Sequence, residues 1–563
     1  MDLNVINKPL FIKDDFKGKK VSFKGPADVI VKVLSSPAAT KTVEIVNSES
    51  TGPAVVDVAA MVGPRSLSDT IDKNPIAGTE TFAREISATG LNCYSPGLIA
   101  LGLTAAAQKP LLNKTVLIDN ATLDHFADIW KDTISCGDKH TRVNKFVDEI
   151  FSGTDVNNNG SKTKIDINSD SIKPKINSLK KLITDEKELN KKELKKQLEE
   201  IIHTISNSQR GNRTNYILNA DKGAHGTTLD LLVDQTYKTG RHIFLNENID
   251  LTNVLKRISS NNKIKIPLSL GIVGTIGYFS QPINRYLTTL RTGQKGFVGY
   301  KPEDQTDEIR PKPPLPLKLA AASGIILIAL TSMGVLSRKG LNVKGLADKL
   351  QFNSMFPNNN HLRVVYSAMI TGRLMGSDDN NELLETACRD YTGFMNWLVL
   401  GGFVTKLTGY ALNKVKLGSG DIKLPIINLT EDISNVNGFF KKLGKIITKT
   451  SIKSIAEIED AALKGNGNTI DKSITNAINS AKAKSAISVA AGFAYSLLAL
   501  GLVMPKVNTV MTHRREQAKK EKTDRNRYES LANKVLDKTT ELNKPQSSDP
   551  KAVLASMGFK IKA

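Results

Sequence analysis

Acidic and basic side chains recur in the same order at two places in the chain. Glu80 is followed four residues later by Arg84, and Glu385 is followed four residues later by Arg389. Residues four apart share one face of a helix, so each glutamate can pair with its arginine. An arginine there can also bind a phosphate or a backbone carbonyl. Because an apolar run follows each copy, we expect these side chains to lie at a membrane interface, capping a helix and marking its orientation or binding a lipid headgroup.

The resemblance between the two places extends beyond the charged pair. The shared residues are Glu80, Thr81, Arg84, Glu85, Thr89, Gly90 and Asn92 in the first copy, and Glu385, Thr386, Arg389, Asp390, Thr392, Gly393 and Asn396 in the second. Each copy is followed by an apolar run, a polar insert and a second apolar run that ends with Pro, Asn-x-x-x-Thr and Arg. The pattern favours an internal duplication covering about 80–291 and 385–515, a known device of membrane proteins. The alternative is that these short sequence motifs match by chance.

Catalytic and metal-binding motifs are absent from the sequence. The cysteines Cys93, Cys136 and Cys388 are too far apart for a disulfide framework or a zinc site, and the histidines have no ligand spacing. The loop 155–160 begins like a calcium loop but departs from that pattern at Lys162, so an Asn-Gly turn is expected. The sequence therefore predicts no cofactor and no metal, and it leans against an enzyme.

Four apolar runs suggest a membrane protein. They cover 266–279, which Pro267 breaks, 317–336, 394–412 and 486–504. A bilayer span needs about 20 apolar residues, and the second and fourth runs come close to that length. We therefore expect a mainly α, polytopic helical membrane protein with about four spans, with soluble helical inserts and a small strand-rich N-terminal segment. Buried helices of a soluble bundle are the alternative reading.

Further interface candidates lie in and after the third apolar run. Lys406 is a charge inside that run and must reach the interface or face the protein interior. Trp397 is placed to act as an interface anchor. The stretch 437–449 has one apolar stripe, flanked by Lys441, Lys442 and Lys445. Such a basic amphipathic helix can lie on an anionic membrane or pack its stripe on the protein.

The composition and the runs divide the chain into segments. These are a strand-rich or loosely ordered N-terminal segment (1–75), the first motif copy with a short apolar hairpin (76–112), a soluble helical insert (113–262), two apolar helices with an acidic Pro-rich linker at 300–316 (263–338), the second motif copy with the third apolar helix (339–412), a polar insert (413–484), the fourth apolar helix (485–512) and a basic mobile tail (513–563).

A formal net charge of +22 favours an anionic partner. Anionic lipid headgroups are the first expectation, and protein partners remain open. Nucleic acid is disfavoured because the basic tail has little aromatic interleaving.

With an even number of spans both termini share one side, and the basic tail places them in the cytoplasm. The basic stretch 437–449 would then lie outside, which conflicts with its charge.

Two hypotheses of different classes follow for the function. The first is an integral membrane protein that acts as a non-enzymatic scaffold or membrane organiser. The second is a transporter or channel component built from two internal repeats, with Lys406 as its key residue. A soluble helical interaction protein is a third reading.

Overall fold

The fold was analysed in a computed structural model of the chain. It describes residues 26–48, 51–72, 74–112, 114–158, 161–185, 187, 189–209, 211–220, 223–246, 250–292, 312–337, 340–352, 357–377, 380–417, 422–433, 436–464, 471–507 and scattered residues between 510 and 534. Helices dominate this part of the chain, which confirms the mainly α fold class.

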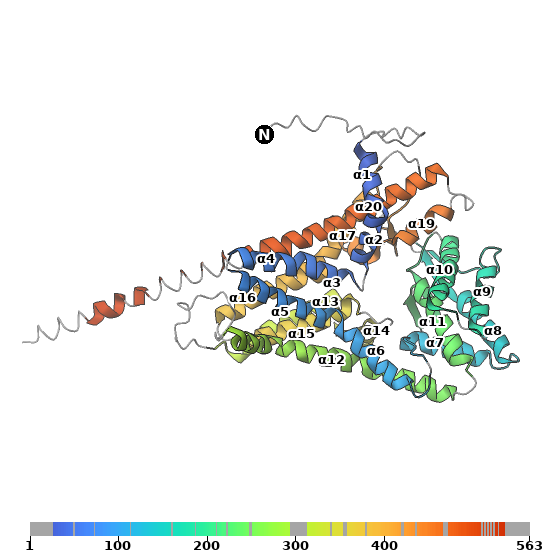
Figure 1. Ribbon diagram of the computed structural model, residues 1–563, viewed down its shortest axis with the longest axis horizontal. Helices are drawn as coiled ribbons and strands as arrows, with labels where there is room; N and C mark the ends of the chain where they lie inside the picture. Colours follow the sequence, from blue (N-terminus) through green and yellow to red (C-terminus); the bar gives the residue numbers. More distant parts are fainter. Residues whose placement is uncertain are drawn as a thin grey trace, which may run out of the picture.

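A long helical bundle carries a separate head at one end (Figure 1). The helices of the bundle are α3 (Gly52–Val56), η2 (Asp57–Val62), α4 (Gly63–Asp72), α5 (Pro75–Cys93), α6 (Ser95–Gln108), α12 (Leu251–Thr292), α13 (Leu315–Ser332), α15 (Asn359–Met375), α16 (Asn380–Met395), η5 (Asn396–Leu400), α17 (Gly401–Leu412), α20 (Lys472–Ser496) and η6 (Leu497–Val503). The segments η2, η5 and η6 have the wider π-helical turn.

The bundle helices run lengthwise and alternate in direction (Figure 1). The run α3–η2–α4 leads away from the head end and α5–α6 returns; α12 leads away and α13 returns; α15 leads away and α16–η5–α17 returns; α20–η6 leads away last. Both polar inserts therefore leave the bundle at the same end.

Glycine allows close contact where α12 and α15 cross. A Cβ on Gly372 would lie 2.3 Å from the carbonyl oxygen of Tyr278, so only glycine fits there.

The helix α12 continues through Pro267 and Pro282. The expected break at Pro267 was therefore wrong.

The N-terminal prediction of strands was also wrong for the described residues. The β-branched runs at 29–34, 43–46 and 55–58 lie in helices α1 (Pro26–Leu34), α2 (Pro37–Asn47) and α3–η2. Prolines preset the first turns of these helices, and Ser36 caps α2 by accepting a hydrogen bond from the Ala39 N–H. The prediction followed β-branched propensity, which is a weak guide where helix caps and tertiary contacts act against it. Residues 1–25 of that segment lie outside the described residues.

The first insert forms most of the head and is not purely helical. Its helices are α7 (Asn120–Asp132), α8 (Lys139–Ser152), α9 (Lys173–Thr184), α10 (Lys191–Ser208), α11 (Leu229–Thr239) and η3 (Gly240–Phe244). They pack on an antiparallel sheet of order β2-β1-β3-β4, formed by β1 (Thr154–Asn158), β2 (Ser161–Lys164), β3 (Tyr216–Ala220) and β4 (Gly223–Thr227). The predicted Asn-Gly turn falls at 159–160, outside the described residues.

An aromatic cluster fills the centre of the head core. Trp130 stacks on Phe244 at 4.4 Å between ring centroids, and Phe146 meets both rings edge-on. One face of α10 points into this core, with Ile201 and Ile205 buried. The helix begins at Lys191 behind the cap Asn190. The first insert therefore has a hydrophobic core of its own.

The second insert is smaller and docks on the first. It contains β7 (Ile427–Leu429), β8 (Thr450–Ile452), α18 (Phe439–Lys449) and α19 (Ile455–Lys464). The helix α19 packs against α10 of the first insert. A short hairpin, β5 (Leu336–Ser337) with β6 (Gly340–Leu341), and α14 (Val343–Lys349) close the head end of the bundle.

Two helices of the described part are long and apolar enough to cross a membrane. They are Leu315–Ser332 and Lys472–Val507, which cover most of the second predicted run and all of the fourth. The first and third runs lie in α12 and α16–η5–α17, which do not meet the same length and composition criteria. The sequence prediction of about four spans is thus supported for two of them.

Candidate functional site

The two copies of the charged motif meet inside the bundle. Arg84 lies 3.6 Å from its chain neighbour Glu85 on α5, and the Arg389 Nε donates to Asp390 Oδ1 at 3.0 Å on α16. Glu85 also interacts electrostatically with Arg389 of the second copy. The site is therefore shared by two helices that are about 300 residues apart in the sequence.

Arginines from two further helices complete this charge network. Arg373 on α15 reaches both oxygens of Asp390 at 3.3 Å. Arg65 on α4 also interacts with Glu85. The side chain of Asp390 is 3% exposed and that of Arg373 is 12% exposed. Because an unpaired charge inside an apolar bundle is strongly destabilising, this mutual pairing ties four helices together.

The sequence prediction chose the right helices, and the structure adds a second acid in each copy. The prediction paired Glu80 with Arg84 and Glu385 with Arg389. Glu85 and Asp390, each directly after its arginine, also lie against these guanidinium groups. Glu80 and Glu385 are half-buried, and Glu385 adds to the electrostatic environment of Arg389. The sequence did carry a signal for Glu85 and Asp390, since an acid directly follows the arginine in both copies.

Arginine side chains also bind the π-helical segments. The Arg65 Nε donates to the carbonyl of Leu500 in η6 at 3.4 Å. Arg363 donates to the carbonyl of Leu398 in η5 at 3.0 Å and to that of Ser332 at 3.2 Å. A π-helical turn disturbs the regular hydrogen-bond ladder, and these donors satisfy carbonyls at the disturbance. Sequence reasoning missed both arginines because their partners are backbone atoms far away in the chain.

The other predicted residues of the third run face the protein. Trp397 is 6% exposed, packs edge-on against Tyr366 and donates its Nε1–H to the carbonyl of Pro53 at 3.1 Å. Its predicted role as an interface anchor is therefore wrong: it locks α3 onto η5. The Lys406 Nζ donates to the carbonyl of Ile447 at 2.8 Å, so it binds the end of α18.

The basic amphipathic helix α18 packs part of its apolar stripe on the protein. Ile446 is buried, whereas Phe439 is 74% exposed. Lys445 pairs with Glu431 at 3.2 Å. Lys441 is exposed and Lys442 is half-buried. The charged site formed by the motif copies includes none of these lysines.

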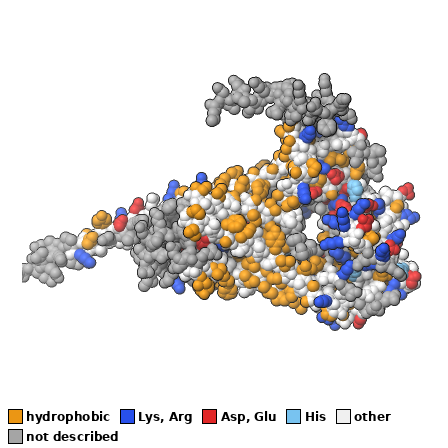
Figure 2. All heavy atoms as spheres, viewed as in Figure 1, with side chains coloured by type: hydrophobic (Ala, Val, Ile, Leu, Met, Phe, Trp, Pro, Cys, Tyr) orange, Lys and Arg blue, Asp and Glu red, His pale blue; other side chains and the backbone are white. Residues whose placement is uncertain are grey.

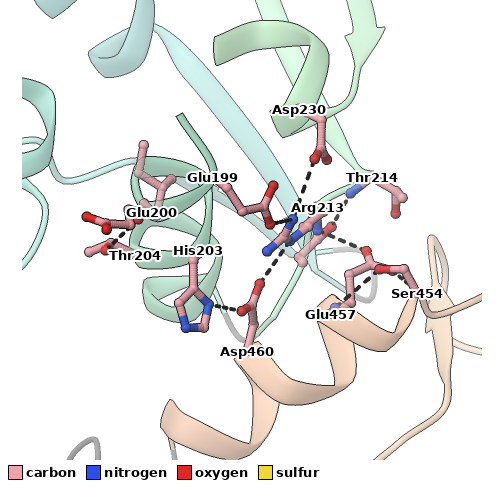
Figure 3. Close-up of polar contacts among 12 residues, drawn as sticks. Glu199, Glu200, His203, Thr204, Arg213, Thr214, Asp230, Ser454, Glu457 and Asp460 are labelled. Atoms are coloured by element: carbon pink, nitrogen blue, oxygen red, sulfur yellow. Dashed lines mark hydrogen bonds and ion pairs between the residues drawn. The ribbon is translucent and has the colours of Figure 1, made fainter. Parts of the chain in front are cut away.

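A second charged cluster joins the two inserts in the head (Figure 3). The Arg213 Nε donates to Asp460 Oδ2 at 2.9 Å, and its Nη1 lies 2.8 Å from Glu199 and 3.5 Å from Asp230. The backbone N–H of Arg213 donates to Glu457 Oε1 at 3.0 Å. Asp460 and Glu457 belong to α19, so Arg213 clamps the second insert onto the first.

The approach of the two backbones at this clamp requires a glycine. Gly211 has a φ of +72°, and a Cβ there would lie 2.5 Å from the carbonyl oxygen of Glu457. His203 adds a contact from α10 to Asp460. Close contact of this kind makes the clamp a fixed joint rather than an open substrate site.

Burial and charge set the ionisation of the clamp. Burial opposes ionisation of Arg213, yet Asp460 and Glu199 raise the pKa of its guanidinium above the ordinary value. Burial raises the pKa of Glu457 above its ordinary value, against the hydrogen bonds from Ser454 and Arg213. Burial likewise raises the pKa of Asp230, against the attraction of Arg213. Arg213 is therefore charged throughout the physiological pH range.

A pair formed by the buried Asp119 and the half-buried His225 stabilises the head at α7. Asp119 caps this helix, since its Oδ1 accepts the Thr122 N–H at 2.8 Å, and the His225 Nε2 on β4 lies 3.3 Å from the same oxygen. Burial opposes ionisation of Asp119, but the hydrogen bond and charge of His225 hold its pKa below the ordinary value. The same hydrogen bond raises the pKa of His225.

Metal-binding geometry is not found among the described residues: no group of three or more His, Cys, Asp or Glu side chains is arranged to hold an ion. No protein-family model, curated protein or solved structure matches the chain.

Replacing Asp460 by Asn should loosen the second insert. Removing one partner of a buried charge pair costs about 3 kcal/mol, because Arg213 keeps its charge. We expect amides of α19 to exchange with deuterium markedly faster in the full-length variant. Glu200→Gln is the control, since its pair with Lys175 is exposed and worth less than about 1 kcal/mol. Equal exchange in both variants would show that the clamp does not hold the joint.

The His225–Asp119 pair should make head stability depend on pH. A raised histidine pKa contributes stability that is complete below its ordinary value of 6.5 and is lost as pH rises through the raised value. We expect wild type to lose about 1 kcal/mol more than His225→Gln between pH 6 and pH 9. Chemical unfolding followed by Trp130 fluorescence measures the difference. His140→Gln, at an exposed site on α8, should behave as wild type.

Proposed function

We propose that the chain is a multi-pass membrane protein in which the helical bundle crosses the bilayer and holds the head on one face, as a non-enzymatic scaffold. The observation that carries this proposal is the low burial of the two apolar helices. Only 17% of the most apolar stretch of α13 is buried, and 33% of that in Lys472–Val507. Core helices of a soluble protein are mostly buried, so the soluble-bundle reading fits poorly.

Exposed apolar side chains continue over the rest of the bundle. Figure 2 shows them spread along the bundle, while Lys, Arg, Asp and Glu gather on the head. On α12 they include Leu268, Ile272, Ile276, Phe279, Ile283, Leu287 and Leu290, and on α13 Leu315, Leu317, Leu319, Ile326 and Leu327. Soluble monomers rarely expose contiguous apolar patches above a few hundred Å². A bilayer around the bundle would cover this surface.

The direction of the helices gives the proposed topology. The chain leaves the head end once more than it returns, so α1 and both inserts would lie on one face of the membrane and the tail after Val507 on the other. The termini would then be on opposite sides. The basic helix α18 would share a side with the head, which removes the conflict found with an even number of spans.

Anionic lipid headgroups are the partner that the head surface fits best. Exposed lysines on and beside α9 and α10 are Lys173, Lys181, Lys187, Lys191, Lys192, Lys195 and Lys196. A basic surface held next to a bilayer is attracted by its acidic lipids, at about 1 kcal/mol for each lysine near the surface. Protein partners with acidic surfaces fit the same lysines.

Transport is a second candidate, favoured by the order of elements in the two halves. The order α4, α5–α6, head insert, α12 is matched by α15, α16–α17, second insert, α20. The contacts correspond as well: α6 packs on α12 as α17 packs on α20. Transporters built from repeats place their sites between the halves, where the charge network around Asp390 lies. This correspondence supports the proposed duplication.

Alkaline carbonate extraction tests the membrane proposal. We expect the full-length protein to stay in the membrane pellet, because its apolar bundle surface cannot be released into water. A peripheral protein held by its basic head would be released by carbonate or by high salt. Recovery of the chain in the supernatant would contradict the proposal.

Proteoliposomes test the transport candidate. We expect a sodium or proton gradient to dissipate faster with wild-type protein than with Asp390→Asn, because the variant leaves the charge of Arg373 uncompensated between the halves. Lys406→Ala is the control: its ammonium binds the end of α18 and lies outside the network. Equal, background-level leakage in all three samples leaves the scaffold as the function.

A further inference from the structure

A buried carboxyl group near the charge network lacks half of its hydrogen bonds. Asp57, the first residue of the π-helical segment η2, is 2% exposed. Its Oδ2 accepts a hydrogen bond from the Thr89 hydroxyl on α5. Its Oδ1 has no hydrogen-bond partner within the described part of the chain. A buried acceptor without a donor raises the free energy of the folded state, so we expect a further group to bind this oxygen.

A second unsatisfied oxygen belongs to a residue on the same face of α5 as Thr89. Asn92 follows Thr89 by one helical turn and is 2% exposed. Its amide Oδ1 also lacks a donor among the described residues. The next residue, Cys93, lies close enough to Asp57 to interact with it electrostatically. The Thr89 hydroxyl thus meets Asp57 where α5 packs on η2, and Asn92 places a second buried acceptor oxygen one turn further along α5.

The charges around this group limit what it can bind. Glu85 from α5, Arg65 from α4 and Arg373 from α15 all act electrostatically on the Asp57 carboxyl. One carboxylate with neutral oxygens, next to two arginines, has too little negative charge for a calcium or magnesium ion, which is usually held by several carboxylates. A single positive charge matches the set. A water molecule satisfies the open oxygen when Asp57 is protonated, but it brings no positive charge to the ionised carboxylate.

We propose that Asp57, Thr89 and Asn92 form a buried site for a monovalent cation, at which a proton and a sodium ion compete for the Asp57 carboxylate. In one state Asp57 is protonated and its O–H donates to an acceptor oxygen. In the other state sodium binds the carboxylate and the oxygens of Thr89 and Asn92, and the proton leaves to solvent, so charge is conserved. The π-helical turn of η2 is typical of functional sites, since it displaces backbone oxygens from the regular ladder.

Sodium binding by the full-length protein in detergent micelles tests the site. Sodium chloride, with choline chloride as the matched salt, is added to weakly buffered protein with a pH-indicator dye. We expect sodium alone to release protons, up to one per chain, and to raise the Tm. The apparent Kd for sodium should increase by up to about tenfold for each unit by which the pH is lowered, as competition for one carboxylate requires.

Two variants locate the response. Asp57→Asn should abolish both the proton release and the sodium-dependent rise in Tm. Asp69→Asn is the matched control: Asp69 on α4 accepts a hydrogen bond from Thr81 on α5 at 2.6 Å, and this variant should keep both responses. If Asp57→Asn does not fold, as judged by circular dichroism and gel filtration, Asn92→Ala replaces it and should weaken sodium binding about tenfold, the effect of losing one good ligand.

Wild type without sodium-specific proton release, or an Asp57→Asn or Asn92→Ala variant with unchanged sodium affinity, overturns the proposal. The site lies inside the bundle and the assay uses no bilayer. A negative result in the sodium assay would therefore not contradict the membrane scaffold. Release of the chain by carbonate would likewise not contradict the cation site.

Discussion

Charged side chains inside an apolar bundle must be compensated within the bundle, and this constraint governs the arrangement of the helices. Asp390 is held by Arg389 from its own helix and by Arg373 from α15, while Glu85 is surrounded by arginines of both halves. Ionic attraction is strong where water is excluded, and an unpaired member would be costly. The network therefore selects one packing of α4, α5, α15 and α16 among the many that apolar contacts alone would permit.

The same principle joins the inserts in the head. Arg213 carries a charge at a nearly buried position, and carboxylates from three helices neutralise it. The two inserts come from different halves of the chain, and each is tethered to the head end of the bundle by helices that return there. A rigid head on a fixed bundle suits a protein that presents a surface. The cation site at Asp57 would add a responsive element to this frame.

Sequence patterns identified the helical class and the two most apolar helices. They misread Val29–Leu34 and Val55–Val58 as strands, because β-branched composition is common to strands and to buried helices. They also treated the inserts as separate soluble pieces. Periodicity reports which face of an element is apolar, but it does not report which other element covers that face.

The sequence by itself determined where the apolar runs and the repeated arginine–acid pairs lie, since these depend on neighbours within a turn or two. Only the tertiary structure decided that Arg373 reaches Asp390, that Trp397 binds Pro53, and that Asp57 Oδ1 has no hydrogen-bond partner among the described residues. These contacts join residues separated by tens to hundreds of positions. They arise from burial, which raises the free-energy cost of every unpaired polar atom and so selects partners that local sequence cannot specify.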